Sequence, residues 1–195
     1  METSISLFMM DESKTDNKES VIDYFLSWTL RMTSETENRN DSVCGYCRQI
    51  LSILLFGNAT KIDIDSLSVR SVKTWKQWRQ IDLCAEIILV DKENKESKHA
   101  LLIEDKAYSK LHGDQLNRYH KIFEDEYENS NFINRHYVYF TIAEKTPFED
   151  KNLCEEANYK AFTMDEIREL IWPTEKELKL TGNDVFDEFW IKNWG

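Results

Sequence analysis

The stretch "HALLIEDKAY", residues 99–108, constrains the fold more than any other part of the chain. Four consecutive apolar residues lead there directly into Glu104, Asp105 and Lys106. Because the side chains of a strand alternate between its two faces, Glu104 and Lys106 share one face and Asp105 lies on the other. Both faces are apolar at the start of this strand, which predicts a central position in a sheet. Both are charged at its end, so we expect the strand to emerge at an edge or a cleft.

The spacing of apolar residues predicts the elements around this strand. Helical spacing indicates helices over 19–32, 43–57, 113–129 and 163–172. Alternating and β-branched residues indicate strands over 66–75, 81–90, 98–106 and 135–143. Short connections join the first three strands into an antiparallel meander, and the strand–helix–strand step that follows implies a mixed sheet. The predicted fold class is therefore α/β, with a mixed central sheet flanked by helices.

The length of 195 residues suits one domain. We expect a polar N-terminal segment (1–18), a main domain (19–172) and an extension rich in aromatic and acidic residues (173–195). This extension is expected to fold back on the domain, and the alternative is a segment that binds a partner.

The charge balance limits the partners of the chain. It has 25 basic and 36 acidic residues, a net charge of −11, which works against unfocused attraction to nucleic acid. A function on DNA or RNA must then depend on a local basic patch or on metal ions. No apolar run reaches the length of a membrane span, and the start lacks a secretory signal. We therefore expect a cytoplasmic protein without membrane contact.

The cysteines agree with a reducing compartment. Cys44 and Cys47 form a CxxC motif at the start of a predicted helix, but a structural zinc usually requires a second such pair, which the sequence lacks. Buried thiols are the expected interpretation, and metal or redox use is the alternative.

The turn between the second and third strands sets which residues of the two strands face each other. A hairpin symmetric about Asn94 places Asp82 opposite Lys106 and Cys84 opposite Glu104. The carboxylates of Asp82 and Glu104 then become diagonal neighbours on one face, about 7–8 Å apart.

Two carboxylates at that separation can share a divalent cation, Mg²⁺ or Mn²⁺, and the main-chain carbonyl of Asp105 can add a ligand. Lys106 lies beside them, where an ammonium group can position a metal-bound water of lowered pKa or offset charge developing on a phosphate. A metal and a phosphate would compensate the cost of charges so near a core. The helix that follows begins within a few residues, and its first N–H groups suit a phosphate. Gln115 in that first turn can hydrogen-bond the same water or a phosphate oxygen.

A basic segment precedes the second strand. The sequence "VRSVKTWKQWRQ" contains four cations and no acid, with two tryptophans between them: Arg70, Lys73, Trp75, Lys76, Trp78 and Arg79. In so acidic a chain, this segment is the best candidate for a nucleic-acid contact. Ordinary exposed hairpin positions are the alternative.

These motifs resemble the PD-(D/E)XK nuclease superfamily. Asp82 in "QIDL" matches its first acid, and Glu104 and Lys106 in "IEDK" match its (D/E)xK element. "DQLNRY" resembles the helix that follows in the bacterial branch with ExK…QLxxY, where Gln115 and Tyr119 recur, although Tyr119 also fits a core position. Two features depart from the family pattern: no proline precedes the first acid, and the segment after the fourth strand is shorter than in many bacterial relatives.

The resemblance implies a restriction-endonuclease-like α-β-β-β-α-β core and metal-dependent cleavage of nucleic-acid phosphodiesters. It assigns catalysis to Asp82, Glu104, Lys106 and Gln115, and it adds an acid on the first helix, Glu19, to the metal ligands Asp82, Glu104 and Asp105. DNA is the expected substrate. A catalytically inactive nuclease-like module that binds protein or nucleic acid is the alternative, and a homodimer joined through the C-terminal extension is a third hypothesis.

Overall fold

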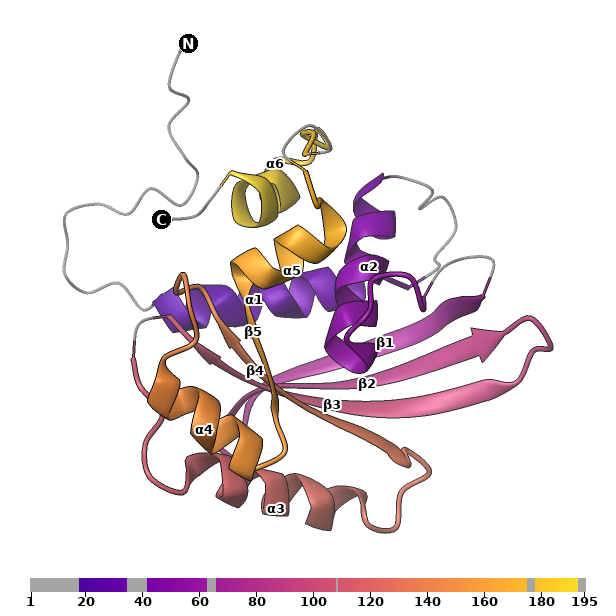
Figure 1. Ribbon diagram of the computed structural model, residues 1–195. Coiled ribbons are helices and arrows are strands. Elements are labelled where there is room, and N and C mark those ends of the chain that lie inside the picture. Colours follow the sequence, from indigo (N-terminus) through magenta and orange to yellow (C-terminus); the bar gives the residue numbers. More distant parts are fainter. Residues whose placement is uncertain (1–17, 35–41, 63–65, 108, 175–177, 193–195) are drawn as a thin grey trace.

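Strand β3 (Glu96–Lys106) is the middle strand of a five-stranded sheet (Figure 1). The computed structural model describes residues 18–34, 42–62, 66–107, 109–174 and 178–192. The other strands are β1 (Leu67–Trp78), β2 (Ile81–Asp91), β4 (Asn134–Thr141) and β5 (Lys160–Thr163). The spatial order is β1-β2-β3-β4-β5, with antiparallel pairing from β1 to β3 and parallel pairing from β3 to β5. The predicted mixed α/β sheet is therefore confirmed.

Helices cover both faces of this sheet (Figure 1). One face carries α1 (Lys18–Arg31), α2 (Ser42–Phe56), α5 (Met164–Ile171), α6 (Asp184–Phe186) and the π-helix η1 (Asp187–Ile191). The opposite face carries α3 (Gln115–Tyr127) and α4 (Phe148–Glu156). None of the described helices has the length and hydropathy needed to cross a membrane.

The side chains of β3 alternate between the two faces of the sheet and contribute to the hydrophobic core on each face. Leu101 and Ile103 are fully buried on the side of α1 and α2, whereas Ala100 and Leu102 are fully buried against α3. A strand whose both faces are buried in this way can lie only inside the sheet. The central position expected from "HALLIEDKAY" follows directly from these two apolar faces.

The β2–β3 hairpin has a different register from the expected one. Its turn is closed by Asp91, which pairs through its main chain with Lys95 and Asn94 and accepts further N–H groups with its carboxylate. Asn94 takes a left-handed conformation (φ 62°) near the end of the turn and not at its centre. Leu83 pairs with Ile103, and the same register extended by one residue places Asp82 opposite Glu104. The expected pairing of Asp82 with Lys106 is therefore wrong by two residues. A shift of two residues leaves every side chain on its face.

Helix α4 and strand β5 lie in a stretch where no helix or strand was expected from the sequence. Within α4, only Asp150 and Cys154 are buried, so the helix has almost no apolar stripe. Strand β5 has four residues, too few for a recognisable alternation. Strand β5 is defined by its pairing with β4, and α4 is held to β4 by Asp150, which accepts from the hydroxyl of Tyr139. A local sequence pattern reveals neither contact.

The C-terminal extension contributes to the core of the domain. Phe186, Phe189 and Trp190 are fully buried in the cluster under α1 and α2. The Phe189 ring stacks on Phe25 at 4.6 Å, and the Trp190 indole donates to the Thr29 hydroxyl at 2.9 Å. These three rings are therefore unavailable to a partner in this conformation, and both the predicted domain boundaries and the homodimer stay predictions.

Candidate active site

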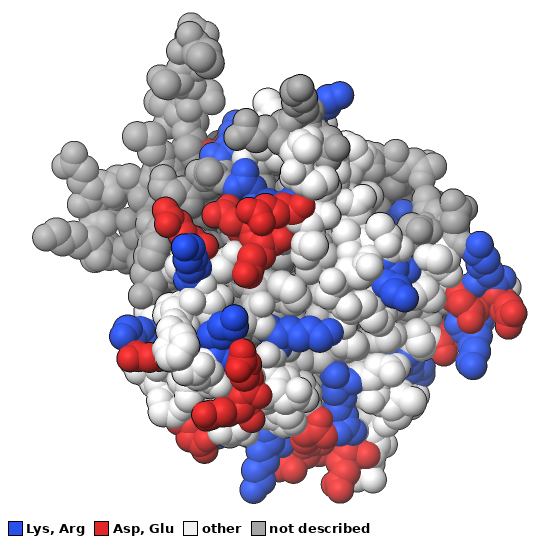
Figure 2. Space-filling model, viewed as in Figure 1, with Lys and Arg blue, Asp and Glu red and all other residues white. Residues whose placement is uncertain are grey.

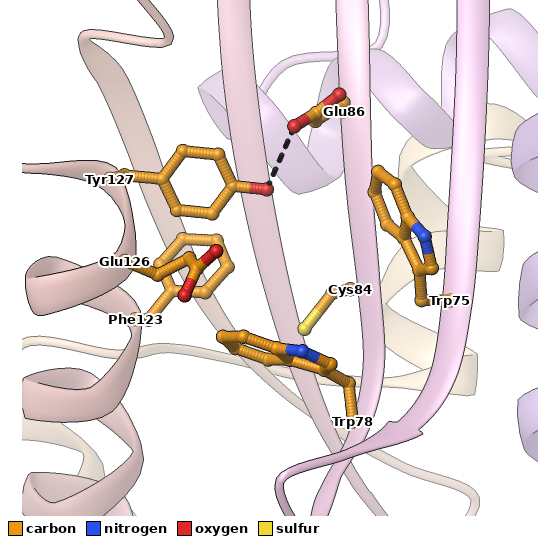
Figure 3. Close-up of a pocket in the computed structure, with 7 residues that line it drawn as sticks. All are labelled: Trp75, Trp78, Cys84, Glu86, Phe123, Glu126 and Tyr127. Carbon is orange, nitrogen blue, oxygen red and sulfur yellow. Dashed lines mark hydrogen bonds between the residues drawn. The ribbon is translucent and has the colours of Figure 1, made fainter. Parts of the chain in front are cut away.

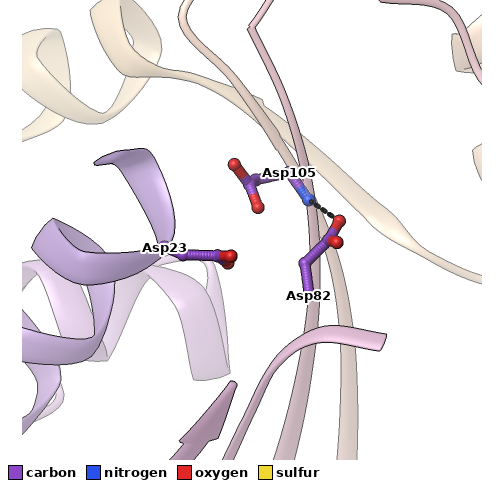
Figure 4. A group of neighbouring side chains, drawn as sticks. All are labelled: Asp23, Asp82 and Asp105. Carbon is purple, nitrogen blue, oxygen red and sulfur yellow. Dashed lines mark hydrogen bonds between the residues drawn. The ribbon is translucent and has the colours of Figure 1, made fainter. Parts of the chain in front are cut away.

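Three aspartates from three elements meet where β2 begins and β3 ends (Figure 4). Asp23 comes from α1, Asp82 from β2 and Asp105 from β3, and one carboxylate oxygen of each lies within 4.8 Å of the others. The N–H of Asp105 donates to Oδ2 of Asp82 at 3.2 Å, which fixes the carboxylate of Asp82 against β3.

Helix α1 and the end of β1 hold this cluster together. Ser27, one turn beyond Asp23, hydrogen-bonds Thr74 of β1 at 2.9 Å. Gln77 has a positive φ of 54°, and its amide donates to Oδ2 of Asp23 at 3.3 Å and to Oδ1 of Asp82 at 3.2 Å. A single side-chain amide thus bridges two carboxylates, at a position where the backbone is left-handed.

A second group lies on the α3 side of β3. Oε1 of Glu104 accepts hydrogen bonds from Nζ of Lys106 and from the amide of Gln115. Gln115 also lies 3.4 Å from the hydroxyl of Tyr119, which is buried in the core as well. Nζ of Lys106 donates to the main-chain carbonyl of Asp105 at 3.1 Å and lies 3.8 Å from Oδ2 of Asp82. Lys106 therefore links the two groups into one site.

Burial sets the electrostatics of this site. Loss of water raises the pKa of Asp23 to about 6, and it raises the pKa of Glu104 to about 8 with a further contribution from Asp82. Burial, with Asp23 and Asp82 close by, holds the pKa of Asp105 well above its ordinary value. Burial alone would lower the pKa of Lys106, but the carboxylates of Glu104, Asp82 and Glu19 together outweigh it and the pKa is raised. Lys106 thus faces the carboxyl groups of Glu104, Asp82 and Asp105, whereas Lys76 acts on Asp23.

Apart from the contact between the carboxyl groups of Asp23 and Asp105 themselves, several carboxylate oxygens of the site accept no hydrogen bond from the described residues. They are both oxygens of Asp105, Oδ1 of Asp23 and Oε2 of Glu104, all shielded from solvent. Buried charges without compensation are costly, and hard divalent cations such as Mg²⁺ and Mn²⁺ bind carboxylate oxygens. Within the described part of the chain, Asp23, Asp82 and Asp105 are the one cluster with metal-ligand spacing. The residues present therefore fit a divalent cation.

The structure brings together Asp82, Glu104, Lys106 and Gln115 as expected from the sequence. Asp105 joins through its carboxylate, whereas its main-chain carbonyl, expected to be a ligand, accepts from Lys106.

Sequence reasoning missed Asp23. It lies one helical turn after Glu19, whose side chain accepts a hydrogen bond from Ser109 and is absent from the aspartate cluster. The role of Glu19 as a ligand stays a prediction. The signal for Asp23 is its position beside Ile22 and Leu26, because an acid next to the buried stripe of a helix needs a partner.

The four basic residues of β1 and its turn do not form one continuous stripe. Arg70 pairs with Glu96, and Arg79 pairs with Glu126 at 3.4 Å. Lys76 lies over the ring of Tyr24 in α1, whereas Lys73 is exposed on the other side of the strand. Figure 2 shows basic and acidic side chains interspersed on the face in view. The nucleic-acid contact of Arg70, Lys73, Lys76 and Arg79 remains a prediction.

The buried cysteines agree with the structural interpretation of the CxxC motif. Cys44, Cys47, Cys84 and Cys154 are all buried. Cys44 and Cys47 lie in α2, among the apolar side chains of the core.

Comparison with known proteins gave one match. The family model of the PD-(D/E)XK nuclease superfamily matches residues 4–193, nearly the whole chain. No curated protein and no solved structure matched. Nucleases of this superfamily generally use divalent metals, which agrees with the buried acidic cluster. From its fold and this match, the chain belongs to the PD-(D/E)XK nuclease superfamily.

Proposed function

We propose that this protein is a nuclease that hydrolyses phosphodiester bonds of DNA with Mg²⁺ or Mn²⁺. The observation that carries the proposal is the cluster of buried carboxyl groups at the end of β3, four of whose oxygens accept no hydrogen bond from an amide, hydroxyl or ammonium group of the described residues. An inactive module would have no need to keep such a costly group of charges.

Each residue has a distinct role in this proposal. Asp23, Asp82 and Asp105 hold the cation, and Glu104, which lies close to Asp82 and has an unpartnered Oε2 among the described residues, adds a further ligand. When bound, the cation supplies Lewis acidity toward water and the phosphate oxygens. The protein orients its acids in advance, since the N–H of Asp105 fixes Asp82.

Among the residues that the structure describes, Lys106 has the one ammonium group that contacts both Asp82 and Glu104. In the substrate complex we assign it to the developing negative charge on the phosphate. Gln115 holds Oε1 of Glu104 and thereby leaves Oε2 for the cation, which makes Gln115 a positioning residue.

Cleavage of supercoiled and linear DNA, with EDTA or with added Mn²⁺, tests this proposal. We expect cleavage only with the metal, and a loss of about 100-fold or more in Asp82→Asn and Lys106→Met. Lys121→Met, an exposed lysine on α3, is the matched control and should cleave like the wild type. Wild-type rates in both active-site variants would contradict the roles, and faster cleavage of RNA of the same sequence would contradict the choice of DNA.

A further inference from the structure

A cavity of about 190 Å³ opens between the β1–β2 hairpin and α3, on the face opposite α1 (Figure 3). Its walls are the rings of Trp75, Trp78, Phe123 and Tyr127 with the carboxylates of Glu86 and Glu126. The wall is therefore aromatic with hydrogen-bond acceptors placed among the rings.

The cavity adjoins the proposed active site. Cys84, which also lines it, follows Asp82 by two residues on β2, about 7 Å along the strand. Trp78 pairs with Ile81, the residue directly before Asp82. A nucleotide bound at the acids can thus reach the cavity with its own base or a neighbouring one.

The chemistry of the wall fits an unstacked nucleobase. Aromatic side chains stack on bases that have left the helix. A carboxylate only accepts hydrogen bonds, and Glu86 is oriented by the hydroxyl of Tyr127, which donates to Oε1 at 3.2 Å. Adenine, cytosine and guanine present an exocyclic amino donor, whereas thymine presents carbonyl oxygens in its place.

An organic cation fits the cavity less well, because the chain supplies its own cations there. Arg79 lies over the ring of Trp78 at 4.8 Å and pairs with Glu126 at 3.4 Å. Lys73 faces Glu86 across the β1–β2 pairing. These two cations also suit the phosphates on either side of a captured base.

We propose that this cavity captures one base bearing an exocyclic amino group, stacked against Trp75 and Trp78 and read by the carboxylate of Glu86. This inference rests on the proposed function, because it adds a preference among substrate sequences to the proposed nuclease activity. Thymine is the base that the cavity disfavours.

Fluorescence anisotropy tests the base preference without cleavage. Full-length protein in EDTA is titrated against fluorescein-labelled hexamers of dC, dA and dT. We expect dC and dA hexamers to bind more tightly than the dT hexamer. Trp75→Leu should weaken binding of the dC hexamer about tenfold, and Glu86→Gln should remove the preference for dC over dT. Phe148→Leu, an exposed ring on α4, should change neither.

Several results would overturn the inference. Equal binding of the three hexamers, or no binding of any of them, would do so. The same would follow if a Glu86→Gln variant whose circular dichroism matches the wild type kept the preference for dC over dT. Quenching of tryptophan fluorescence by tetramethylammonium and not by the hexamers would assign the cavity to an organic cation instead. A parallel Mn²⁺ cleavage assay separates the two proposals. Cleavage without a base preference would contradict only the proposed base-binding cavity, and a base preference without cleavage would contradict only the proposed nuclease activity.

Discussion

Asp105 is fully buried, yet neither of its carboxylate oxygens accepts a hydrogen bond from an amide, hydroxyl or ammonium group of the described residues. The sequence could predict that charges end this strand, because Glu104, Asp105 and Lys106 directly follow an apolar run. It could not predict Asp23, because that residue reaches the site through the packing of α1 on the sheet. No local spacing in the sequence indicates this packing. Acids neighbouring in sequence are therefore foreseeable, and an acid from a distant helix is not.

Glu104 provides a test through pH. Burial and the nearby Asp82 raise its pKa from 4.5 to about 8 in the folded protein. Because the folded state keeps a proton that the unfolded state has released, the free energy of unfolding falls as the pH rises through this range. His99 and His136, whose pKa values are lowered by burial, act in the opposite direction only below their ordinary pKa of 6.5.

The interval from pH 6.5 to 8 therefore lies above the titration of the histidines, and the fall across it is assigned to the buried carboxyl groups whose pKa values are raised, Glu104 and Asp105. In EDTA we expect the free energy of unfolding to fall by about 1–2 kcal/mol across it, measured by urea denaturation. Glu104→Gln should show a smaller fall, because its amide does not titrate. The same fall in both proteins would show that another group is responsible.

At the scale of elements, long periodic segments were predictable and short ones were not. The four predicted strands and the four predicted helices all exist, with ends that differ by a few residues. Strand β5 and helix α4 were missed because neither repeats an apolar pattern. The register was missed by two residues because Asp91, and not Asn94, organises the turn.

Helix α5 has a cap whose energy can be measured. The hydroxyl of Thr163 accepts from the N–H of Glu166 at 3.0 Å, and the carboxylate of Glu166 accepts from the N–H of Thr163 at 2.7 Å. Loss of such a cap typically costs about 1 kcal/mol. Thr163→Ala should therefore lower the free energy of unfolding by about that amount in urea, while the exposed Thr174→Ala should leave it unchanged. No difference between these variants would mean that the cap contributes nothing.

At the scale of the whole molecule, the two ends of the described chain share one core. The extension returns to α1, where Phe189 stacks on Phe25 and Trp190 hydrogen-bonds Thr29. The family match over residues 4–193 likewise extends beyond the strands that hold the acids. Since Asp23 lies on α1, packing of the extension also supports the position of a proposed metal ligand.

Trp190→Ala should accordingly destabilise the protein by about 3–5 kcal/mol, the usual cost of removing a fully buried large ring. Leu180→Ala changes an exposed residue of the same extension and should have little effect. Thermal unfolding of both variants checks this. Equal, small effects would show that the extension is not part of the cooperative core.

Calorimetric titration of Mn²⁺ into metal-free protein tests the central claim, that the carboxylates at the end of β3 hold a divalent cation. We predict saturable binding to the wild type and to Asp125→Asn, an exposed control on α3, and loss of that binding in Asp105→Asn. The Asp105→Asn protein should also be more stable without metal, because burying an amide beside Asp23 and Asp82 costs less than burying a carboxyl group there. Undiminished Mn²⁺ binding by Asp105→Asn, or none by the wild type, would contradict the account.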